Sequence, residues 1–452
     1  MYMPGSMTIN SRGHLAIGEQ DLVELAEKYG TPLYVYDESL IRERCRAYRE
    51  ALNQHYPQGE ILFAGKAFLT LGMGRLLLQE GLGLDVVSAG ELYIAAQAGF
   101  PMERVCFHGN NKSPAELKMA LDLGVGRIAV DSLMELDRLE EKASRRRKIV
   151  PLLLRVRPGI SADTHRYIQT GQEDSKFGLG ISDGQVFAAV KKVLKSPYLE
   201  LLGLHCHIGS QILDSQPFQL AAEIMMDLRE EIRLKTGTLL PELNLGGGLG
   251  IRYIAGDRPV GISDLVMLLA ETLKKKAREH NSTLPRLLLE PGRSIVGEAG
   301  ITLYTVGTIK DVPGVRRYVS VDGGMSDNLR SALYGARYRA LLANRPQEPA
   351  EETVTVAGKA CESGDILIYD LRLPSPRPGD ILAVLSTGAY HFSMFSHYNR
   401  HLRPAVVFIN GGLTELVVKR ETLEDLIRPE LIPPHLEKEP DFKTVGELGG
   451  SA

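Results

Sequence analysis

Short apolar runs alternate with longer segments of helical period between residues 61 and 290. In SPAELKMALDLG (113–124) the apolar residues recur at spacings of three and four, which is typical of a helix that buries one face. Ser113 suits the cap of this helix, Pro114 suits its first position, and the segment ends on glycine, as does a similar segment at 217–237. The strands that we predict between such helices are 61–66, 84–88, 105–109, 127–131, 149–158, 199–210, 241–247 and 286–290.

These eight runs are apolar along most of their length, whereas a half-exposed strand would alternate apolar and polar residues. Continuous apolar strands are buried on both faces, as in a parallel sheet that is covered by helices. Eight strand–helix units are also the number that closes such a sheet into a barrel. We therefore predict an α/β fold with a (β/α)8, TIM-like barrel. The alternative is an open, doubly wound sheet.

The helical spacing nearly disappears after about residue 300, which predicts a second, β-rich domain of barrel or sandwich type. LYVYD (33–37) also has the pattern of a strand, and it precedes a predicted helix at 39–53. We assign residues 38–298 to the barrel, and residues 1–37 and 299–452 to the β-rich domain. We expect the polar tail after residue 435 to be loose. The runs that carry the β pattern are ITLYTVGTI, RYVSVDGG, ETVTVAGKA, DILIYDL, DILAVLSTGAY and PAVVFI.

Composition narrows the possible functions to small-molecule chemistry. Of 452 residues, 44% are hydrophobic and 24% are charged, which is ordinary for a soluble globular chain, and a net charge of -3 gives no general attraction to nucleic acid or an anionic membrane. The four cysteines form no C-x-x-C pair, so we predict neither a zinc ribbon nor a disulfide framework. The amino-terminal residues lack a secretion signal, and no segment is long and apolar enough to span a membrane. We expect a cytoplasmic protein with neither a nucleic-acid nor a membrane partner.

The last residues of the predicted strands are the candidates for chemistry, because barrel enzymes build their sites there. The first strand ends in Lys66 and the eighth in Glu290, while Gly246, Gly247 and Gly248 end the seventh. Such a glycine run can offer backbone N–H groups to a phosphate, although glycines after strands often serve only tight turns.

A buried carboxylate such as Glu290 needs a cationic or proton-bearing partner. That partner is either Arg293 or a protonated pyridine nitrogen. If Lys66 forms an imine with an aldehyde and the glycines bind its phosphate, the three features together predict pyridoxal 5'-phosphate as cofactor. A phosphate-binding aldolase that uses Lys66 without a cofactor is the rival interpretation.

The sixth strand carries His205 and His207, which share one face of the strand. Such a pair can bind a metal ion, but we find no matching ligand set at the other strand ends, so we predict no metal. His207 suits a ring that stacks on a cofactor, and Ser210 suits a hydroxyl beside its phosphate.

With these residues in place, the chain resembles the diaminopimelate decarboxylases, barrel-type pyridoxal phosphate enzymes of fold type III, over about residues 10–430. The resemblance implies that Lys66 binds the cofactor, that His207 stacks on its ring, and that Glu290 holds the ring nitrogen. The motifs that carry it are FAGKA, LDVVSAGEL, HGNNKS, HCHIGSQ, LNLGGGLG, LEPGR, DGGMSDNLRSALYGARY, CESGD and GAY.

The resemblance also implies further site residues and a homodimer with shared active sites. Ser210, Gly248, Gly292 and Arg293 would contact the cofactor, and Tyr390 both cofactor and substrate. A second subunit would contribute Cys361, as proton donor, and Glu362. The residues that would bind the substrate are Arg293, Arg330, Tyr334, Glu362 and Tyr390.

The implied activity is the decarboxylation of meso-2,6-diaminopimelate to L-lysine and carbon dioxide, the last step of lysine biosynthesis. An arginine fork binds a distal carboxylate, whereas a cationic distal amine would require an acidic residue. Arg330 with Tyr334 therefore favours diaminopimelate over ornithine, lysine, arginine or carboxynorspermidine. An alanine racemase would need a tyrosine base on the second domain, and the remaining alternative is a non-catalytic regulatory homologue.

The chain departs from the family pattern in three places that bear on substrate stringency. Arg157 stands where the family has Asn, Gly358-Lys359-Ala360 precede Cys361, and residues 391–404 are altered. The loop at 165–178 matches the family, and we expect it to cover the distal end of the substrate.

Overall fold

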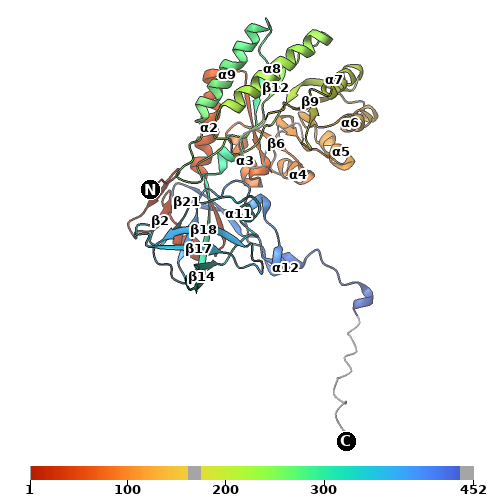
Figure 1. Ribbon diagram of the computed structural model, residues 1–452. Coiled ribbons are helices and arrows are strands. Elements are labelled where there is room, and N and C mark those ends of the chain that lie inside the picture. Colours follow the sequence, from red (N-terminus) through yellow and green to blue (C-terminus); the bar gives the residue numbers. More distant parts are fainter. Residues whose placement is uncertain (1, 161–174, 438–452) are drawn as a thin grey trace.

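A computed structural model gives the structure over residues 2–160 and 175–437. Figure 1 shows two parts, a barrel ringed by helices and a region rich in strands, with the residues from α12 (Leu423–Ile427) to 437 leading away from the second part. Most of the predicted loop at 165–178 and of the predicted tail after residue 435 lie outside the described residues. No helix within the described ranges combines the length and the apolar character that crossing a membrane requires.

Eight parallel strands close into a barrel, as predicted. Each strand pairs in parallel with the next, and the ring closes where β13 pairs with β5 and where β8 pairs with β9. The alternative of an open sheet is therefore wrong. The order around the ring is β5 (Glu60–Ala64), β6 (Gly83–Val86), β7 (Val105–Phe107), β8 (Arg127–Val130), β9 (Val150–Arg157), β11 (Leu199–His205), β12 (Glu242–Asn244) and β13 (Arg286–Leu289), with the short β10 (Leu179–Gly180) added beside β9.

Helices cover the outside of this ring, and their ends carry the predicted signals. Ser113 caps α5 (Pro114–Leu123) in a capping box with Glu116, and Gly124 ends the helix in the left-handed conformation. Gly237 ends α8 in the same way. The other helices of the layer are α2 (Glu38–His55), α3 (Leu71–Gln79), α4 (Ala89–Gln97), α6 (Leu133–Arg146), α7 (Gln185–Lys195), α8 (Gln216–Thr236) and α9 (Ile262–Glu279).

The interior of the barrel is packed with apolar side chains, and a pair of charged side chains closes its amino-terminal end. A buried apolar cluster comprises Leu62, Cys106, Ala129, Leu153 and Leu288, one from each of five strands. Arg127 and Glu242, the first residues of β8 and β12, form a two-pronged ion pair of 2.6 and 2.7 Å. The opposite end of the barrel, where the strands finish, is left for the site.

The second part is built on a sheet that contains a strand from each end of the chain. β4 (Leu33–Asp37) pairs antiparallel with β14 (Gly300–Val312) and parallel with β20 (Ala405–Asn410). All six predicted runs form strands, but the sequence pattern missed β1 to β3, β16 and β21. The remaining strands are β1 (Met7–Ile9), β2 (Leu15–Ile17), β3 (Gln20–Asp21), β15 (Arg316–Val321), β16 (Ala340–Leu342), β17 (Glu352–Ala357), β18 (Ile366–Leu373), β19 (Ile381–Val384) and β21 (Leu413–Val418).

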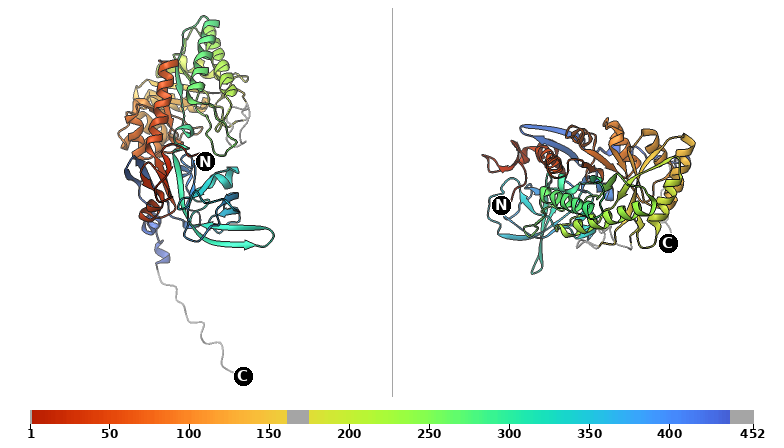
Figure 2. Two further views of the ribbon diagram at one scale, coloured as in Figure 1. Left: turned by 90° about the vertical axis from the view of Figure 1, so that its left-hand side faces the viewer. Right: turned by 90° about the horizontal axis from the view of Figure 1, so that it is seen from above.

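Two further views show how this part sits against the barrel. In Figure 2 the β14–β15 hairpin extends away from the body of the molecule, while the rest of the strand-rich part lies below the barrel. Three short helices complete it: α1 (Leu22–Tyr29), α11 (Leu329–Tyr334) and α12 (Leu423–Ile427). The domain boundaries at residues 38 and 298 stay a prediction.

Candidate active site at the mouth of the barrel

A cavity of about 420 Å³ lies between the strand ends of the barrel and the strand-rich part. Eight of the predicted site residues meet in it: Lys66, His207, Ser210, Glu290, Arg293, Arg330, Tyr334 and Tyr390. The other lining residues are Asp85, Val87, His108, Gly109, Asn110, Arg155, Phe177, His205 and Met394.

Lys66 lies on a single 3-10 turn, Gly65–Ala67, that directly follows β5. The strand therefore ends two residues before the predicted position. The turn is fixed from the second part of the molecule, because the Tyr390 N–H donates to the carbonyl of Ala67 (2.9 Å) and the Ser393 hydroxyl to that of Lys66 (2.9 Å). The Lys66 side chain is thus held at the wall of the cavity.

Glu290 follows β13 and is buried, with 6% of its surface exposed. Its Oε1 accepts hydrogen bonds from the Asn244 amide (2.6 Å) and from His108 Nε2 (2.8 Å), and its Oε2 lies 3.1 Å from His205 Nε2. Arg293 instead donates to Ser210 (2.9 Å) and Tyr253, so the interpretation that pairs it with Glu290 is wrong. Burial alone would raise the pKa of Glu290, but His108 and His205 hold it well below its ordinary value.

The pKa values of the two histidines beside Glu290 are shifted in opposite directions. Burial opposes the charged form of His108, but Asp85 and Glu290 outweigh it and raise its pKa well above the ordinary value. Burial lowers the pKa of His205 to about 4. At neutral pH the site therefore holds a cationic His108 and a neutral His205 around an anionic Glu290.

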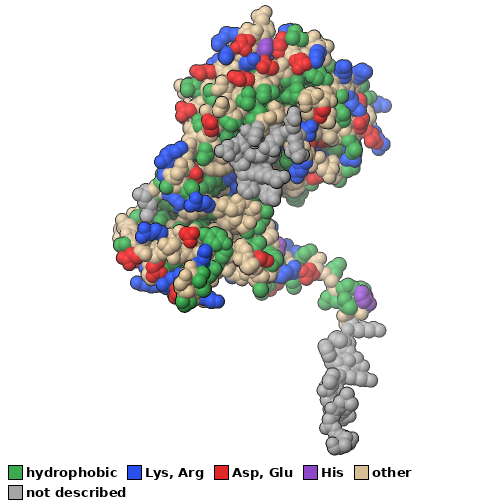
Figure 3. Space-filling model, viewed as in Figure 1, with side chains coloured by type: hydrophobic (Ala, Val, Ile, Leu, Met, Phe, Trp, Pro, Cys, Tyr) green, Lys and Arg blue, Asp and Glu red, His purple; other side chains and the backbone are tan. Residues whose placement is uncertain are grey.

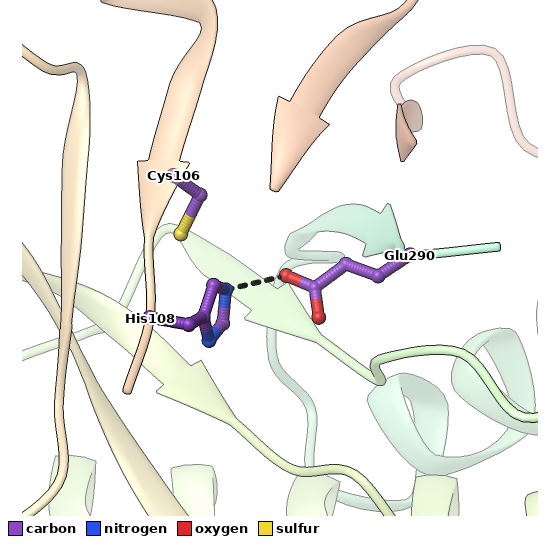
Figure 4. Close-up of side chains that lie close together, drawn as sticks. All are labelled: Cys106, His108 and Glu290. Atoms are coloured by element: carbon purple, nitrogen blue, oxygen red, sulfur yellow. Dashed lines mark hydrogen bonds and ion pairs between the residues drawn. The ribbon is translucent and has the colours of Figure 1, made fainter. Parts of the chain in front are cut away.

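Cys106, His108 and Glu290 also bring three potential metal ligands within 4.8 Å of one another (Figure 4). This group includes neither His205 nor His207, so the prediction that the other strand ends supply no ligand set to match that pair stays untested. Burial raises the pKa of the Cys106 thiol, which opposes the thiolate that a metal would need. Because His108 and Glu290 already bond each other, we assign no metal here.

The glycine run after β12 is used differently from its prediction. The N–H of Gly246 donates to the Asn244 side chain (2.8 Å) and that of Gly247 to His207 Nδ1 (3.4 Å), so these two N–H groups are not free for phosphate. A Cβ at Gly247 would lie 2.1 Å from the carbonyl oxygen of Glu290, so close packing requires glycine there. None of the three glycines is among the lining residues of the cavity, and Gly248 stays the predicted phosphate contact.

The cationic wall of the cavity comes mainly from α11 and the turn after β13. The Arg330 guanidinium lies over the rings of Tyr334 (4.8 Å) and Tyr390 (5.4 Å), and that of Arg293 lies 4.8 Å from the Tyr390 ring. Both arginines are buried. Gly292 does not line the cavity, but a Cβ there would lie 2.9 Å from that of Ala67, so glycine lets the β13 turn approach the Lys66 turn.

Cys361 and Glu362 are exposed and do not line the cavity of their own chain. Their turn is nevertheless well fixed, because the Cys361 N–H donates to Asn399 Oδ1 (2.7 Å). The buried carboxylate of Asp365 accepts from the N–H groups of Ala360 (2.8 Å) and Met325 (2.6 Å). This is the arrangement expected of a turn that serves another subunit, and that role stays a prediction.

The departures from the family pattern lie mostly outside the cavity. Arg157 donates to the carbonyl of Ser175 (3.1 Å) and lies 3.4 Å from Asp183, away from the cavity lining. Within the altered 391–404 segment, Met394 lines the cavity.

Several lining residues escaped the sequence analysis. Arg155 and Asp85 each interrupt an apolar strand, and a charged residue within a buried strand was the signal that could have found them. Asn110 lies in a loop and Met394 ends a single 3-10 turn, Phe392–Met394, and no periodicity pointed to either.

Comparison with known proteins agrees with this geometry. The family described as "Pyridoxal-dependent decarboxylase, pyridoxal binding domain" matches residues 38–297. A diaminopimelate decarboxylase of Bacillus subtilis (strain 168) is 51% identical over 431 residues, covering 95% of this chain and 98% of that protein, and one of Staphylococcus aureus (strain COL) is 47% identical over 419 residues, covering 92% and 98%. The crystal structure of diaminopimelate decarboxylase from M. jannaschii in co-complex with L-lysine superposes with a TM-score of 0.90 at 36% identity, covering 95% of this chain and 99% of that one.

Proposed function

This chain belongs to the diaminopimelate decarboxylase family, and we propose on that basis that it removes carbon dioxide from meso-2,6-diaminopimelate to give L-lysine, the last step of lysine biosynthesis. The observation that carries the proposal is that Lys66, Glu290 and Arg330 line one cavity, although they come from opposite ends of the barrel sequence and from the second part of the chain. An amine, a buried anion and a buried cation are thereby placed around one small volume.

The residues of the cavity fit pyridoxal 5'-phosphate. Glu290 is buried and anionic, which suits a partner that brings a positive charge or a proton. Lys66 would hold the cofactor through its amine, His207 would lie against its ring, and Ser210, Gly248 and Arg293 would contact its phosphate side. When bound, pyridoxal phosphate supplies an electron sink for the electron pair that the departing carboxylate leaves behind.

Residues of the protein would support this chemistry by stabilising charge and by positioning the substrate and the cofactor. Glu290 would favour a proton at the ring nitrogen of the cofactor through its negative charge, and its buried position would exclude the water that screens this interaction. Tyr390 lies next to both arginines and to the Lys66 turn, so it can contact substrate and cofactor together.

The distal end of the cavity fits a carboxylate better than an amine. The lining residues contributed by the strand-rich part are Arg330, Tyr334, Tyr390 and Met394, none of them acidic. A guanidinium can bind a carboxylate through two parallel hydrogen bonds, whereas a cationic distal amine would meet like charge here. This supports diaminopimelate over ornithine, lysine or arginine.

We further propose that the working unit is a homodimer with shared sites. Cys361 and Glu362 would reach the cavity of a second copy, where the thiol would return a proton to the substrate carbon and Glu362 would contact the substrate. The exposure of this turn and its anchoring by Asp365 support the proposal. All four cysteines are free thiols, which supports a reducing compartment such as the cytoplasm.

A substrate panel tests the function. Purified protein with pyridoxal phosphate is assayed for carbon dioxide release from meso-diaminopimelate, ornithine, lysine, arginine and carboxynorspermidine. We expect diaminopimelate to be preferred, and Arg330→Met to lower kcat/KM for it by about a hundredfold, because a charge-assisted contact is lost.

Arg337→Met is the matched control, since Arg337 is exposed, follows the same helix and does not line the cavity. It should leave kcat/KM within about twofold of wild type. A wild-type preference for ornithine or lysine would contradict the proposed substrate.

A further inference from the structure

The donors around Glu290 offer an inference beyond its contact with a cofactor. Three side chains from three different strand ends converge on this carboxylate: Asn244 ends β12, His205 ends β11 and His108 follows β7. Figure 4 shows His108 reaching across the barrel to Glu290. The donors are not shared equally between the two carboxylate oxygens.

Oε1 of Glu290 has both of its acceptor positions filled. It accepts from the Asn244 amide at 2.6 Å and from His108 Nε2 at 2.8 Å. Among the described residues, the only donor that reaches Oε2 is His205 Nε2, at the longer distance of 3.1 Å. Since a carboxylate oxygen has two lone pairs, Oε2 keeps one for a further donor.

Both hydrogen-bond donors to Oε1 also contact other groups that restrict their movement. Asn244 is fully buried, and its carbonyl oxygen accepts the N–H of Gly246 at 2.8 Å, so its amide group cannot turn over without losing that bond. The His108 ring lies 3.8 Å from Asp85 and packs edge-on against the His205 ring at 4.6 Å. Asn244 is therefore fixed independently of Glu290, and the His108 ring is confined by its buried neighbours, so the two together set the carboxylate plane.

His205, which contacts Oε2, is the weaker hydrogen-bond donor of the two histidines. It is neutral at neutral pH, and its Nδ1 has no hydrogen-bond partner within the described part of the chain. A neutral ring donates a weaker hydrogen bond to a carboxylate than the cationic His108 does.

We propose that Asn244 and His108 are positioning residues that fix Oε1 of Glu290, so that Oε2 is presented to the ring nitrogen of the cofactor. This inference rests on the proposed pyridoxal phosphate function. Neither residue needs to touch the cofactor, because each acts through the orientation of Glu290.

The test measures cofactor binding by the full-length protein rather than turnover. Cofactor-free wild type, Asn244→Ala and His108→Ala are titrated with pyridoxal phosphate by equilibrium dialysis, and the visible spectrum is recorded at saturation. We expect dissociation constants about ten- to a hundredfold higher than wild type, the range seen when the partners that orient a ligating group are removed. The shape of the visible band should change as well.

Conservative variants separate orientation from loss of folding. His108→Gln retains a donor that can reach Oε1 and should recover part of the affinity, while Asn244→Ser is the milder change if the alanine variant does not fold. Arg127→Met, which breaks the Arg127–Glu242 pair at the far end of the barrel, should lower the thermal midpoint but leave the dissociation constant and the visible band unchanged.

The outcomes distinguish two failures. If wild type binds pyridoxal phosphate while the Asn244 and His108 variants bind it with wild-type affinity and spectrum, the positioning inference is overturned. If wild type does not bind pyridoxal phosphate, the proposed function fails instead.

Discussion

Asp327 shows how a single buried residue can tie stability to pH. It precedes α11, which carries Arg330, and its side chain accepts hydrogen bonds from the Tyr304 hydroxyl (2.5 Å) and the Gly324 N–H (3.0 Å). Burial raises its pKa to about 7. The charged form is therefore expensive in the folded protein.

Stability should fall as the pH rises through the window that this pKa defines. An unfolded aspartate releases its proton near pH 4, so between about pH 4 and pH 7 the folded state holds a proton that the unfolded state has lost. Asp327→Asn should remove this dependence and stabilise the protein at pH 8 by at most about 4 kcal/mol. Thermal unfolding of both proteins from pH 4.5 to 8.5 measures the difference.

The exposed Asp370 gives the comparison, because Asp370→Asn removes one surface carboxylate while the buried Asp327, and the fall in stability assigned to it, stay in place. Parallel pH profiles for wild type and Asp327→Asn would contradict the assignment to Asp327.

Among single residues, sequence reasoning succeeded where a side chain sits at a strand end and failed where contacts decide its use. Lys66, His207 and Glu290 follow their strands and meet at the barrel mouth. The N–H groups of Gly246 and Gly247 are taken by Asn244 and His207, and no sequence pattern shows such a competition for a backbone donor.

At the scale of elements, the join between α4 and α5 rests on one carboxylate. Glu116 accepts the Ser113 N–H (2.9 Å), which completes the capping box of α5, and also the N–H of Ala89 (3.1 Å), the first residue of α4. One side chain thus satisfies donors at the start of two neighbouring helices.

Glu116→Ala should therefore destabilise the protein more than Ser113→Ala does. Loss of the serine cap costs about 1 kcal/mol, whereas loss of Glu116 leaves two backbone donors unpaired and should cost about 2–3 kcal/mol. The free energy of unfolding in urea measures both. Lys118→Ala, an exposed change on the same helix, should stay within about 0.5 kcal/mol of wild type. Equal losses for Glu116→Ala and Ser113→Ala would show that the bond to Ala89 contributes nothing.

The elements that the sequence predicted are helices long enough to show a period and barrel strands marked by apolar runs, even where, as in β7 and β12, the strand has three residues. β21 has six residues but was missed, because none of its side chains is buried. All eight barrel strands and the helices at 113–124 and 217–237 were recognised. β3 and β10 have two residues each and β16 has three, so none of them spans a full alternation that could be detected. Tertiary pairing alone defines these strands.

At the scale of the whole molecule, the distribution of surface charge does not indicate where a second copy would bind. In Figure 3 the Lys and Arg side chains are interspersed with Asp and Glu over the visible face of both parts. An interface is better predicted from the turn of Cys361, which is fixed and yet does not line the cavity that contains Lys66 and Glu290.

Subunit mixing tests the shared site. Lys66→Ala and Cys361→Ala should each be nearly inactive. When the two are mixed and allowed to exchange, half of the dimers are mixed dimers, each with one intact site of two. Activity should therefore recover to about a quarter of the wild-type value, as two-fold symmetry requires. Mixing Lys66→Ala with itself is the control, and no recovery in the mixed sample would place Cys361 outside the neighbouring site.

The position of β4 has a consequence for how the molecule is made. This early strand lies between β14 and β20, so both of its neighbours leave the ribosome more than 260 residues after it does. During synthesis the backbone donors and acceptors of β4 therefore stay unpaired while the entire barrel emerges and folds. A nascent chain released before residue 405 would thus carry a finished barrel attached to an unpaired strand edge, which favours its capture by chaperones or by another unfinished chain.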